Sequence, residues 1–271
     1  ALLLGWVETL MTSVKTSNAL PEPDTRPREV MVRLRGIRKR YDNFWAVKGV
    51  DLEIPRGELF GFLGPNGAGK TTTMMMLAGL LQPTEGTAEV AGFNVSTLTV
   101  QAKQHLGYVP DRPYVYEKLS GREFVSVLAD MYGVEPSAAK HQGEHWLRAL
   151  GLAEKRDELV EGYSHGMRQR LVLAATLTFD PEVLIIDEPM VGLDPQAARL
   201  FKRLMRERCD AGRTVLMSTL TMPVAEETCD RGGIMNRGEL LALGTIDELR
   251  AGGANDGASL EEIFFAMTEG D

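Results

Sequence analysis

A glycine-rich segment that ends in a lysine and two threonines carries the residue types that bind a phosphate group. Glycines let backbone N–H groups converge on an anion without a Cβ in the way. A lysine can then reach the β- and γ-phosphates of a nucleotide, and a threonine hydroxyl can ligate Mg²⁺. The alternative is an ordinary glycine-rich turn that binds no ligand. The candidate residues are consecutive: Gly64, Pro65, Asn66, Gly67, Ala68, Gly69, Lys70, Thr71 and Thr72.

The segments on either side of this loop read as the strand and the helix that such a loop needs. Residues 59–63 form an apolar run that predicts a buried strand, and residues 72–78 predict a helix. A helix that begins at the loop adds its unpaired N–H groups and the positive end of its dipole. Strand, glycine-rich turn, Lys-Thr and helix in this order make a P-loop, which predicts that the chain binds a nucleotide.

A second strand-like run ends in two carboxylates. Residues 183–186 are all apolar, which suits a central parallel strand covered on both faces, and Asp187 and Glu188 follow directly. Carboxylates at the carboxyl end of such a strand would face the P-loop, because open α/β sheets place their ligands there. We expect Asp187 to hold Mg²⁺ through water ligands and Glu188 to act as general base toward the attacking water. Without the P-loop, this segment would read as a turn after a core strand.

A third segment, residues 163–171, lies between these two along the chain. It resembles the signature motif of ATP-binding cassette (ABC) ATPases, commonly Leu-Ser-Gly-Gly-Gln, with Ser164 and Gly166 at the two positions that matter most chemically. The resemblance implies that Ser164, Gly166 and the following backbone amides bind the γ-phosphate of a nucleotide held by a second subunit. An isolated Ser-x-Gly is usually a helix cap, so the resemblance depends on the position of the segment between the other two motifs.

Other segments resemble the family in the expected order, over about residues 30–268. Tyr41 stands ahead of the P-loop, where ABC ATPases carry an aromatic residue that stacks on adenine; the alternative is an aromatic residue at a strand end. Asp194 stands in a segment similar to the D-loop, which lies beside the phosphate of the opposite subunit. Asp111 replaces the glutamine that usually contacts Mg²⁺ and the attacking water, and its carboxylate can still accept from a metal-bound water. Residues 244–245 and 259–264 look like the tail of bacterial exporter ATPases.

The sharpest departure from the family is Leu220. ABC ATPases carry a switch histidine here, which contacts the γ-phosphate and helps to position the residue equivalent to Glu188 and the attacking water. A leucine side chain offers neither a donor nor a proton, and the four histidines of the chain lie in other segments. We expect ATP and Mg²⁺ binding to survive and hydrolysis to be slowed. The alternative is that Leu220 packs harmlessly and another group compensates.

Composition limits the classes of protein that fit. The 271 residues carry a net charge of −8, which argues against a broad nucleic-acid surface. No apolar run approaches the roughly 20 residues needed to span a bilayer, so a membrane role is expected to come from a partner. Cys209 and Cys229 show no metal or redox spacing and are expected to be reduced thiols.

These motifs and the periodicity predict an α/β fold. We expect a P-loop NTPase core with a mostly parallel sheet, an N-terminal antiparallel β subdomain and an inserted helical subdomain. Residues 1–28 read as an appendage and linker, 29–245 as the ABC ATPase domain and 246–271 as a C-terminal tail. The helical subdomain is expected at about 113–165, where Ser120 and Glu123 match a capping box.

The function implied by the resemblance is that of the nucleotide-binding subunit of an ABC exporter, which binds and hydrolyses ATP with Mg²⁺ at a dimer interface. Its expected partners are a transmembrane permease and a second nucleotide-binding subunit, identical or not, and no nucleic acid. Its expected place is the peripheral, cytoplasmic face of the cell membrane. The alternative is a degenerate cassette that binds ATP, hydrolyses little of it and serves an active partner or regulation. The soluble ABC ATPases of translation or DNA repair fit less well, because no tandem cassette, long coiled coil or zinc motif is visible in the sequence.

Overall fold

The computed structural model describes residues 29–190, 195–251 and 259–268, and the strands of this part form two sheets. The strand bounds are β1 Val30–Tyr41, β2 Phe44–Pro55, β3 Leu59–Leu63, β4 Glu85–Val90, β5 Phe93–Asn94, β6 Leu106–Val109, β7 Val183–Ile186, β8 Thr214–Thr219, β9 Arg231–Asn236 and β10 Glu239–Thr245. One sheet is six-stranded, in the order β10-β9-β3-β8-β7-β6, and the other is four-stranded, in the order β2-β1-β4-β5.

The six-stranded sheet is parallel at its centre, which confirms the expected P-loop core. β3 pairs in parallel with β8 and β9, and β7 pairs in parallel with β8 and β6. Every residue of β3 and β7 is buried. Leu59 and Leu63 of β3 pack into one core cluster and Phe60 and Phe62 into another, the alternation of a strand covered on both faces.

The four-stranded sheet is antiparallel, which confirms the expected N-terminal antiparallel β subdomain. β1 pairs with β2 and β4, and β4 pairs with β5. The β1–β2 hairpin ends in a tight turn that places Tyr41 opposite Phe44. Helix α2 (Lys70–Leu77) shares a core cluster with this sheet and with β3, so the P-loop is anchored between the two sheets.

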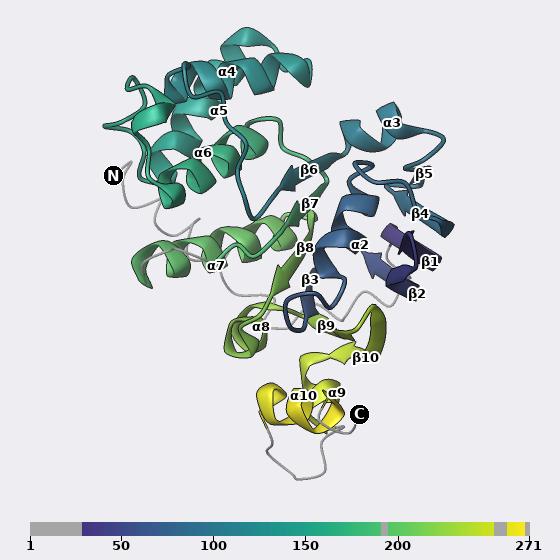
Figure 1. Cartoon of the computed structure of the whole chain (residues 1–271). Coiled ribbons are helices and arrows are strands. Elements are labelled where there is room, and N and C mark those ends of the chain that lie inside the picture. The colour runs from purple at the N-terminus through teal and green to yellow at the C-terminus, as the bar shows by residue number, and fades with distance from the viewer. Residues whose placement is uncertain (1–28, 191–194, 252–258, 269–271) are drawn as a thin grey trace, which may run out of the picture.

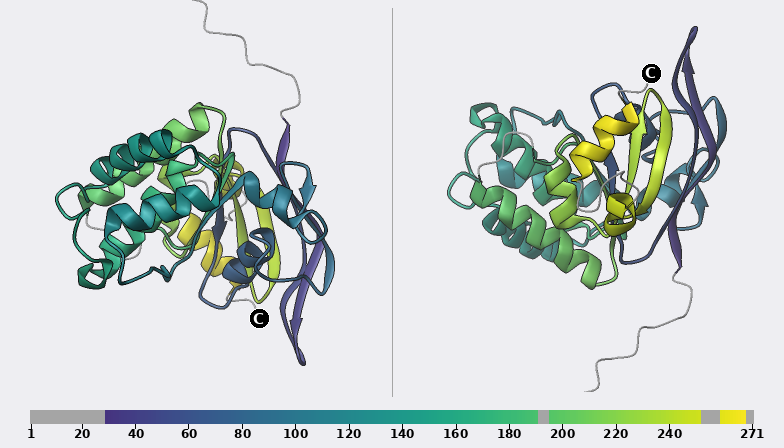
Figure 2. Two further views of the ribbon diagram at one scale, coloured as in Figure 1. Left: turned by 90° about the horizontal axis from the view of Figure 1, so that it is seen from above. Right: turned by 90° about the horizontal axis from the view of Figure 1, so that it is seen from below.

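The helices α4 to α7 lie on the other side of the six-stranded sheet from the four-stranded one (Figures 1 and 2). The remaining helix bounds are α3 Thr99–Gln104, α4 Gly121–Met131, α5 Pro136–Ala149, α6 His165–Thr178, α7 Pro195–Asp210, α8 Met222–Thr228, α9 Ile246–Ala251 and α10 Leu260–Thr268, with a short 3₁₀ helix at Val160–Gly162. The chain boundaries near residues 28, 113, 165 and 245 stay predictions.

The first turn of α4 has the capping box expected from the sequence. The Ser120 hydroxyl accepts the Glu123 N–H at 3.3 Å, and the Glu123 carboxylate accepts the Ser120 N–H at 2.8 Å. Two N–H groups that the helix leaves unpaired thus find partners locally. The sequence therefore sets where α4 begins.

Cys209 and Cys229 are free and buried, and burial raises the pKa of the Cys209 thiol to about 12 and that of Cys229 far above its ordinary value. Among the described residues, no helix combines the length and the apolar character that crossing a membrane requires.

Candidate functional site

The loop between β3 and α2 has the backbone geometry that the P-loop motif predicts. A Cβ at Gly64 would lie 2.1 Å from the Met235 carbonyl oxygen, so only glycine fits there. Gly69 is the N-cap of α2, with a φ of 104°. Gly67 has a φ of 82° and nothing within 4 Å of the place of a Cβ, so the loop is open on this side. Backbone N–H groups can therefore meet a ligand at the open side of the loop.

Lys70 begins α2, and its side chain turns back into the loop. Its Nζ donates to the carbonyl oxygens of Gly64 at 2.6 Å and Pro65 at 3.1 Å. The same ammonium lies 3.5 Å from Glu188 Oε1, and the Lys70 side chain is buried. The charge that would meet a nucleotide phosphate is thus held between the loop and the carboxylate.

The two carboxylates that follow β7 differ in their surroundings. Asp187 is buried, and its Oδ1 accepts from the Ser218 hydroxyl. Among the described residues, Asp187 Oδ2 and Glu188 Oε1 are buried and have no hydrogen-bond partner. Glu188 Oε1 lies near the Lys70 ammonium, whereas Asp187 Oδ2 is, in this part of the chain, an unpaired carboxylate oxygen of the kind that suits a hydrated divalent cation, so the Asp187 carboxylate fits Mg²⁺. Thr71, the other expected ligand, lines the neighbouring pocket. Residues 29–190, 195–251 and 259–268 hold no group of three His, Cys, Asp or Glu arranged as a metal site.

Glu188 has a left-handed backbone, with a φ of 48°, which a non-glycine residue adopts only when its surroundings hold it. Its N–H donates to Ser218 Oγ at 2.9 Å, and its carbonyl accepts from Gln169 Nε2 at 3.4 Å. Its carboxylate Oε2 accepts the backbone N–H of Leu220 at 3.2 Å. Leu220 therefore contacts Glu188 through its backbone N–H, and the residue as a whole is 48% exposed.

One pocket of about 310 Å³ gathers most of the residues that the sequence singles out. It runs from the β1–β2 hairpin across the P-loop to the carboxyl ends of β6 and β7. Its lining residues are Tyr41, Phe44, Ala46, Pro65, Asn66, Gly67, Ala68, Gly69, Lys70, Thr71, Thr72, Asp111 and Glu188. Tyr41 and Phe44 form an aromatic end, while Lys70 and the P-loop form a phosphate-binding end, so the pocket has the shape and chemistry for a nucleotide.

Four of the predicted residues do not line this pocket, and one lies outside the described residues. Gly64 begins the P-loop but is not among the lining residues. Ser164 is the exposed N-cap of α6, where its hydroxyl accepts the Met167 N–H at 3.3 Å, and Gly166 lies in the first turn of that helix. Asp187 is buried beneath the pocket rather than in its wall. Asp194 is the residue that falls outside the described part of the chain. The roles of all these site residues stay predictions.

Four residues near the site carry no role in the sequence-based expectations: Phe44, Tyr108, Gln169 and Ser218. The hairpin signal could have indicated Phe44, because cross-strand partners share a face. Tyr108 lies near the carboxylates of Asp187 and Asp111. Burial is the main cause that raises the pKa of Tyr108 well above the ordinary value, and the charges of these two carboxylates add to it. Gln169 and Ser218 lie far from Glu188 in the sequence, so no local pattern points to them.

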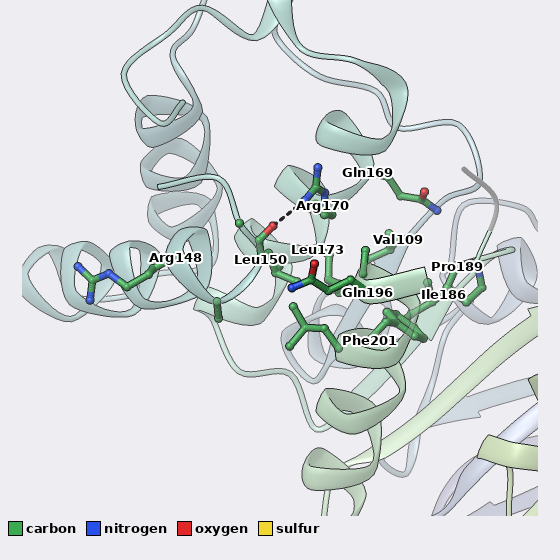
Figure 3. Close-up of a pocket in the computed structure, with 14 residues that line it drawn as sticks. Val109, Arg148, Leu150, Gln169, Arg170, Leu173, Ile186, Pro189, Gln196 and Phe201 are labelled. Atoms are coloured by element: carbon green, nitrogen blue, oxygen red, sulfur yellow. Dashed lines mark hydrogen bonds between the residues drawn. The ribbon is translucent and has the colours of Figure 1, made fainter. Parts of the chain in front are cut away.

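A second pocket, of about 300 Å³, lies among α5, α6, α7 and the ends of β6 and β7 and shares no lining residue with the first. Its walls are mainly apolar, with Leu173, Ile186 and Phe201 among them. Figure 3 shows the Arg148 guanidinium directed away from it and Arg170 bonded to the Leu150 carbonyl, at 3.1 Å. This pocket therefore lacks the phosphate-binding groups of the first.

Comparison with known proteins places the chain among ATP-binding subunits. The family model described as "ABC transporter" matches residues 47–191. The linearmycin resistance ATP-binding protein LnrL of Bacillus subtilis is 37% identical over 225 residues, which are 82% of this chain and 72% of that protein. The daunorubicin/doxorubicin resistance ATP-binding protein DrrA of Streptomyces peucetius is 36% identical over 220 residues, 81% of this chain and 67% of that protein.

A longer relative and a solved structure agree with this placement. The probable multidrug ABC transporter ATP-binding protein YbhF of Escherichia coli is 37% identical, but this chain spans only 42% of its length. A solved ATP-binding subunit of an ABC transporter superposes with a TM-score of 0.83 at 29% identity, over 88% of this chain and 99% of that one. The P-loop pocket, the family match and these relatives together establish that the chain belongs to the ABC transporter family, as an ATP-binding subunit.

Proposed function

We propose that this chain is the nucleotide-binding subunit of an ABC exporter, which binds ATP with Mg²⁺ and hydrolyses it slowly. The observation that carries the proposal is the pocket in which Tyr41, the P-loop, Asp111 and Glu188 meet. The export direction is supported by relatives named for linearmycin resistance, for daunorubicin/doxorubicin resistance and for Nod factor export.

Each end of the pocket has its own part in binding and hydrolysis. Tyr41 stacks on the base, and the P-loop amides and Lys70 bind the phosphates. Thr71, Asp187 and Asp111 would hold Mg²⁺, which neutralises charge on the phosphate oxygens when it is bound. Glu188 accepts the proton of the attacking water, and the Leu220 N–H at 3.2 Å fixes one of its carboxylate oxygens.

The rest of the site would come from a second nucleotide-binding subunit. Ser164 and Gly166 are at the start of α6, away from the P-loop pocket of their own chain. The N-terminus of a helix suits the γ-phosphate of a nucleotide held by the opposite subunit. Asp194 would lie at the same interface, and closure and reopening of the dimer would drive a transmembrane permease at the cytoplasmic face of the membrane.

Slow hydrolysis follows from the side chain at position 220. The Leu220 N–H orients Glu188, but the leucine side chain supplies no donor to the γ-phosphate in the transition state. Loss of one such donor costs on the order of 10²–10³ in rate in other enzymes. A cassette that mainly binds ATP and serves an active partner is the second candidate, and the same residue favours it.

Single-turnover hydrolysis of bound ATP tests the proposal. Leu220→His is expected to raise the rate of the chemical step by about 10²-fold or more, with little change in ATP affinity. Thr221→His, which puts an imidazole at the exposed neighbouring position, is the matched control and is expected to leave the rate unchanged. Glu188→Gln defines the rate without the base. Equal rates for the unchanged chain and Leu220→His would contradict slowed hydrolysis, and absence of ATP binding would contradict the whole proposal.

A further inference from the structure

We propose that Ser218 is a positioning residue that holds Asp187 and Glu188 together for ATP hydrolysis. The inference rests on the proposed function of the site and assigns a role to a residue that does not line the nucleotide pocket. Ser218 lies on β8, beside the end of β7, and its side chain is fully buried. It reaches both carboxylate residues at once.

The hydroxyl of Ser218 has both of its hydrogen-bonding functions engaged. The backbone N–H of Glu188 can only donate, so Ser218 Oγ is the acceptor of this bond, at 2.9 Å. The hydroxyl proton is therefore free to be donated, and it goes to Asp187 Oδ1. One side chain thus links the residue expected near Mg²⁺ to the residue expected to act as base.

This link also supports the unusual backbone of Glu188. The preceding N–H, that of Asp187, bonds to the Val109 carbonyl at 2.9 Å and so continues the pairing of β7 with β6. At Glu188 the chain turns into a left-handed conformation, with a φ of 48°, and the N–H bonds to the side chain of Ser218 instead. A residue in this conformation persists only where its neighbours hold it. Ser218 therefore helps to set the direction in which the Glu188 side chain leaves the strand.

The two residues that follow Ser218 do not duplicate this contact. The Thr219 hydroxyl accepts the Thr221 N–H at 3.0 Å. Leu220 contributes its backbone N–H to Glu188 Oε2 and has no polar side-chain atom. In a chain whose switch position is a leucine, the Ser218 hydroxyl is the side-chain group at the end of β8 that bonds to the carboxylate pair.

Removal of the hydroxyl is expected to slow the chemical step more than it weakens nucleotide binding. Ser218→Ala would leave the Glu188 N–H and Asp187 Oδ1 without this partner, while Tyr41 and the P-loop keep their positions around the nucleotide. Hydrogen bonds to charged groups are worth enough for a loss of about ten- to a hundredfold in single-turnover rate. The KM for ATP is expected to stay within about threefold, because the Ser218 hydroxyl bonds to Asp187 and Glu188 and not to the nucleotide.

The experiment compares four chains in single-turnover ATP hydrolysis: the unchanged protein, Ser218→Ala, Ser218→Thr and Thr178→Val. Ser218→Thr keeps the hydroxyl and is expected to recover most of the rate that Ser218→Ala loses. Thr178→Val removes another buried hydroxyl, which donates to the Ala174 carbonyl at 2.8 Å within α6, and is expected to hydrolyse ATP like the unchanged chain. Urea unfolding of each variant separates loss of rate from loss of fold.

A second measurement does not depend on hydrolysis. Binding of a non-hydrolysable ATP analogue is titrated with Mg²⁺, and Ser218→Ala is expected to need several-fold more Mg²⁺ for half-saturation, because Asp187 loses the bond that orients it. A Ser218→Ala variant with an unchanged rate and an unchanged Mg²⁺ requirement overturns the proposal, as does an equal slowing in Thr178→Val. If the unchanged chain binds the analogue but hydrolyses no ATP, the proposed function fails, and the Mg²⁺ titration still decides the role of Ser218.

Discussion

Glu188 is held by residues from three other segments of the chain. Lys70 approaches its carboxylate from α2, Gln169 reaches its carbonyl from α6, and Ser218 and Leu220 bond to it from the end of β8. The contacts from Lys70 and Leu220 reach the carboxylate itself and fix its direction better than packing alone. Direction matters for a general base because proton transfer requires close alignment. The sequence predicts the role of base for Glu188 from its place after an apolar strand. The residues that hold it could not be predicted, because they meet Glu188 only through the fold.

At the same scale, the aromatic end of the pocket yields a prediction about Phe44. It faces Tyr41 across the β1–β2 turn, both side chains line the proposed nucleotide pocket, and Phe44 is 65% exposed. Stacking on a base is worth about 1–3 kcal/mol per aromatic contact in nucleic-acid examples. Phe44→Ala is therefore expected to weaken ATP binding about fivefold or more, with a nearly unchanged rate for bound ATP.

Calorimetric titration with ATP and with inorganic triphosphate checks the role of Phe44. The loss is expected for ATP and not for triphosphate, since the latter has no base to stack. Tyr114→Ala removes an aromatic side chain that is 88% exposed and lies outside the pocket, so it serves as the control. An equal loss for both ligands would contradict a stacking role.

At the scale of elements, the sequence predicts those whose signals are local. Five apolar residues predict β3, four predict β7, and the Ser120–Glu123 pair predicts the start of α4, because each signal lies within the element itself. The neighbours of each strand are not local information: β3 lies between β8 and β9, which follow it by more than a hundred residues. For this reason the end of β8, with Ser218, could not be placed beside Asp187 from the sequence.

The cap of α4 gives a prediction that belongs to the element alone. Ser120→Ala removes the acceptor for the Glu123 N–H and is expected to lower the free energy of unfolding by about 1 kcal/mol. Ser126→Ala is the matched control, since Ser126 is an exposed residue within the same helix, where alanine is the better helix former. Urea unfolding followed by circular dichroism measures both. A Ser120→Ala variant as stable as Ser126→Ala would show that the capping box does not hold α4.

At the scale of the whole molecule, the nucleotide pocket lies where the two sheets meet. The β1–β2 hairpin of the four-stranded sheet brings Tyr41 and Phe44, and the six-stranded sheet brings the P-loop after β3 and Glu188 after β7. Two core clusters, one on each face of the six-stranded sheet, hold these parts together. Binding of a nucleotide in this pocket is therefore expected to depend on the packing of the core, and one of the two clusters contains the buried thiols of Cys209 and Cys229.

The last prediction concerns the stability of the molecule at alkaline pH. Burial raises the pKa of Cys209 to about 12 and that of Cys229 higher still, whereas an exposed thiol in the unfolded chain titrates near 8.5. The native state thus keeps protons that the unfolded state loses, so the stabilisation is complete below about pH 8 and is lost as the pH rises toward the pKa values of the folded state.

By linkage, each thiol is expected to cost about 1.4 kcal/mol of unfolding free energy by pH 9.5, relative to pH 7.5. Urea unfolding under reducing conditions at these two pH values measures the loss. The Cys209→Ala/Cys229→Ala variant starts from a lower stability because two buried side chains are shortened, but it is expected to lose about 3 kcal/mol less between the two pH values. The difference in pH dependence, rather than the stability at either pH, is the diagnostic quantity, because the cavity cost is the same at both. Equal pH dependence in the two proteins would mean that the thiols ionise in the native state and are not sealed within the core.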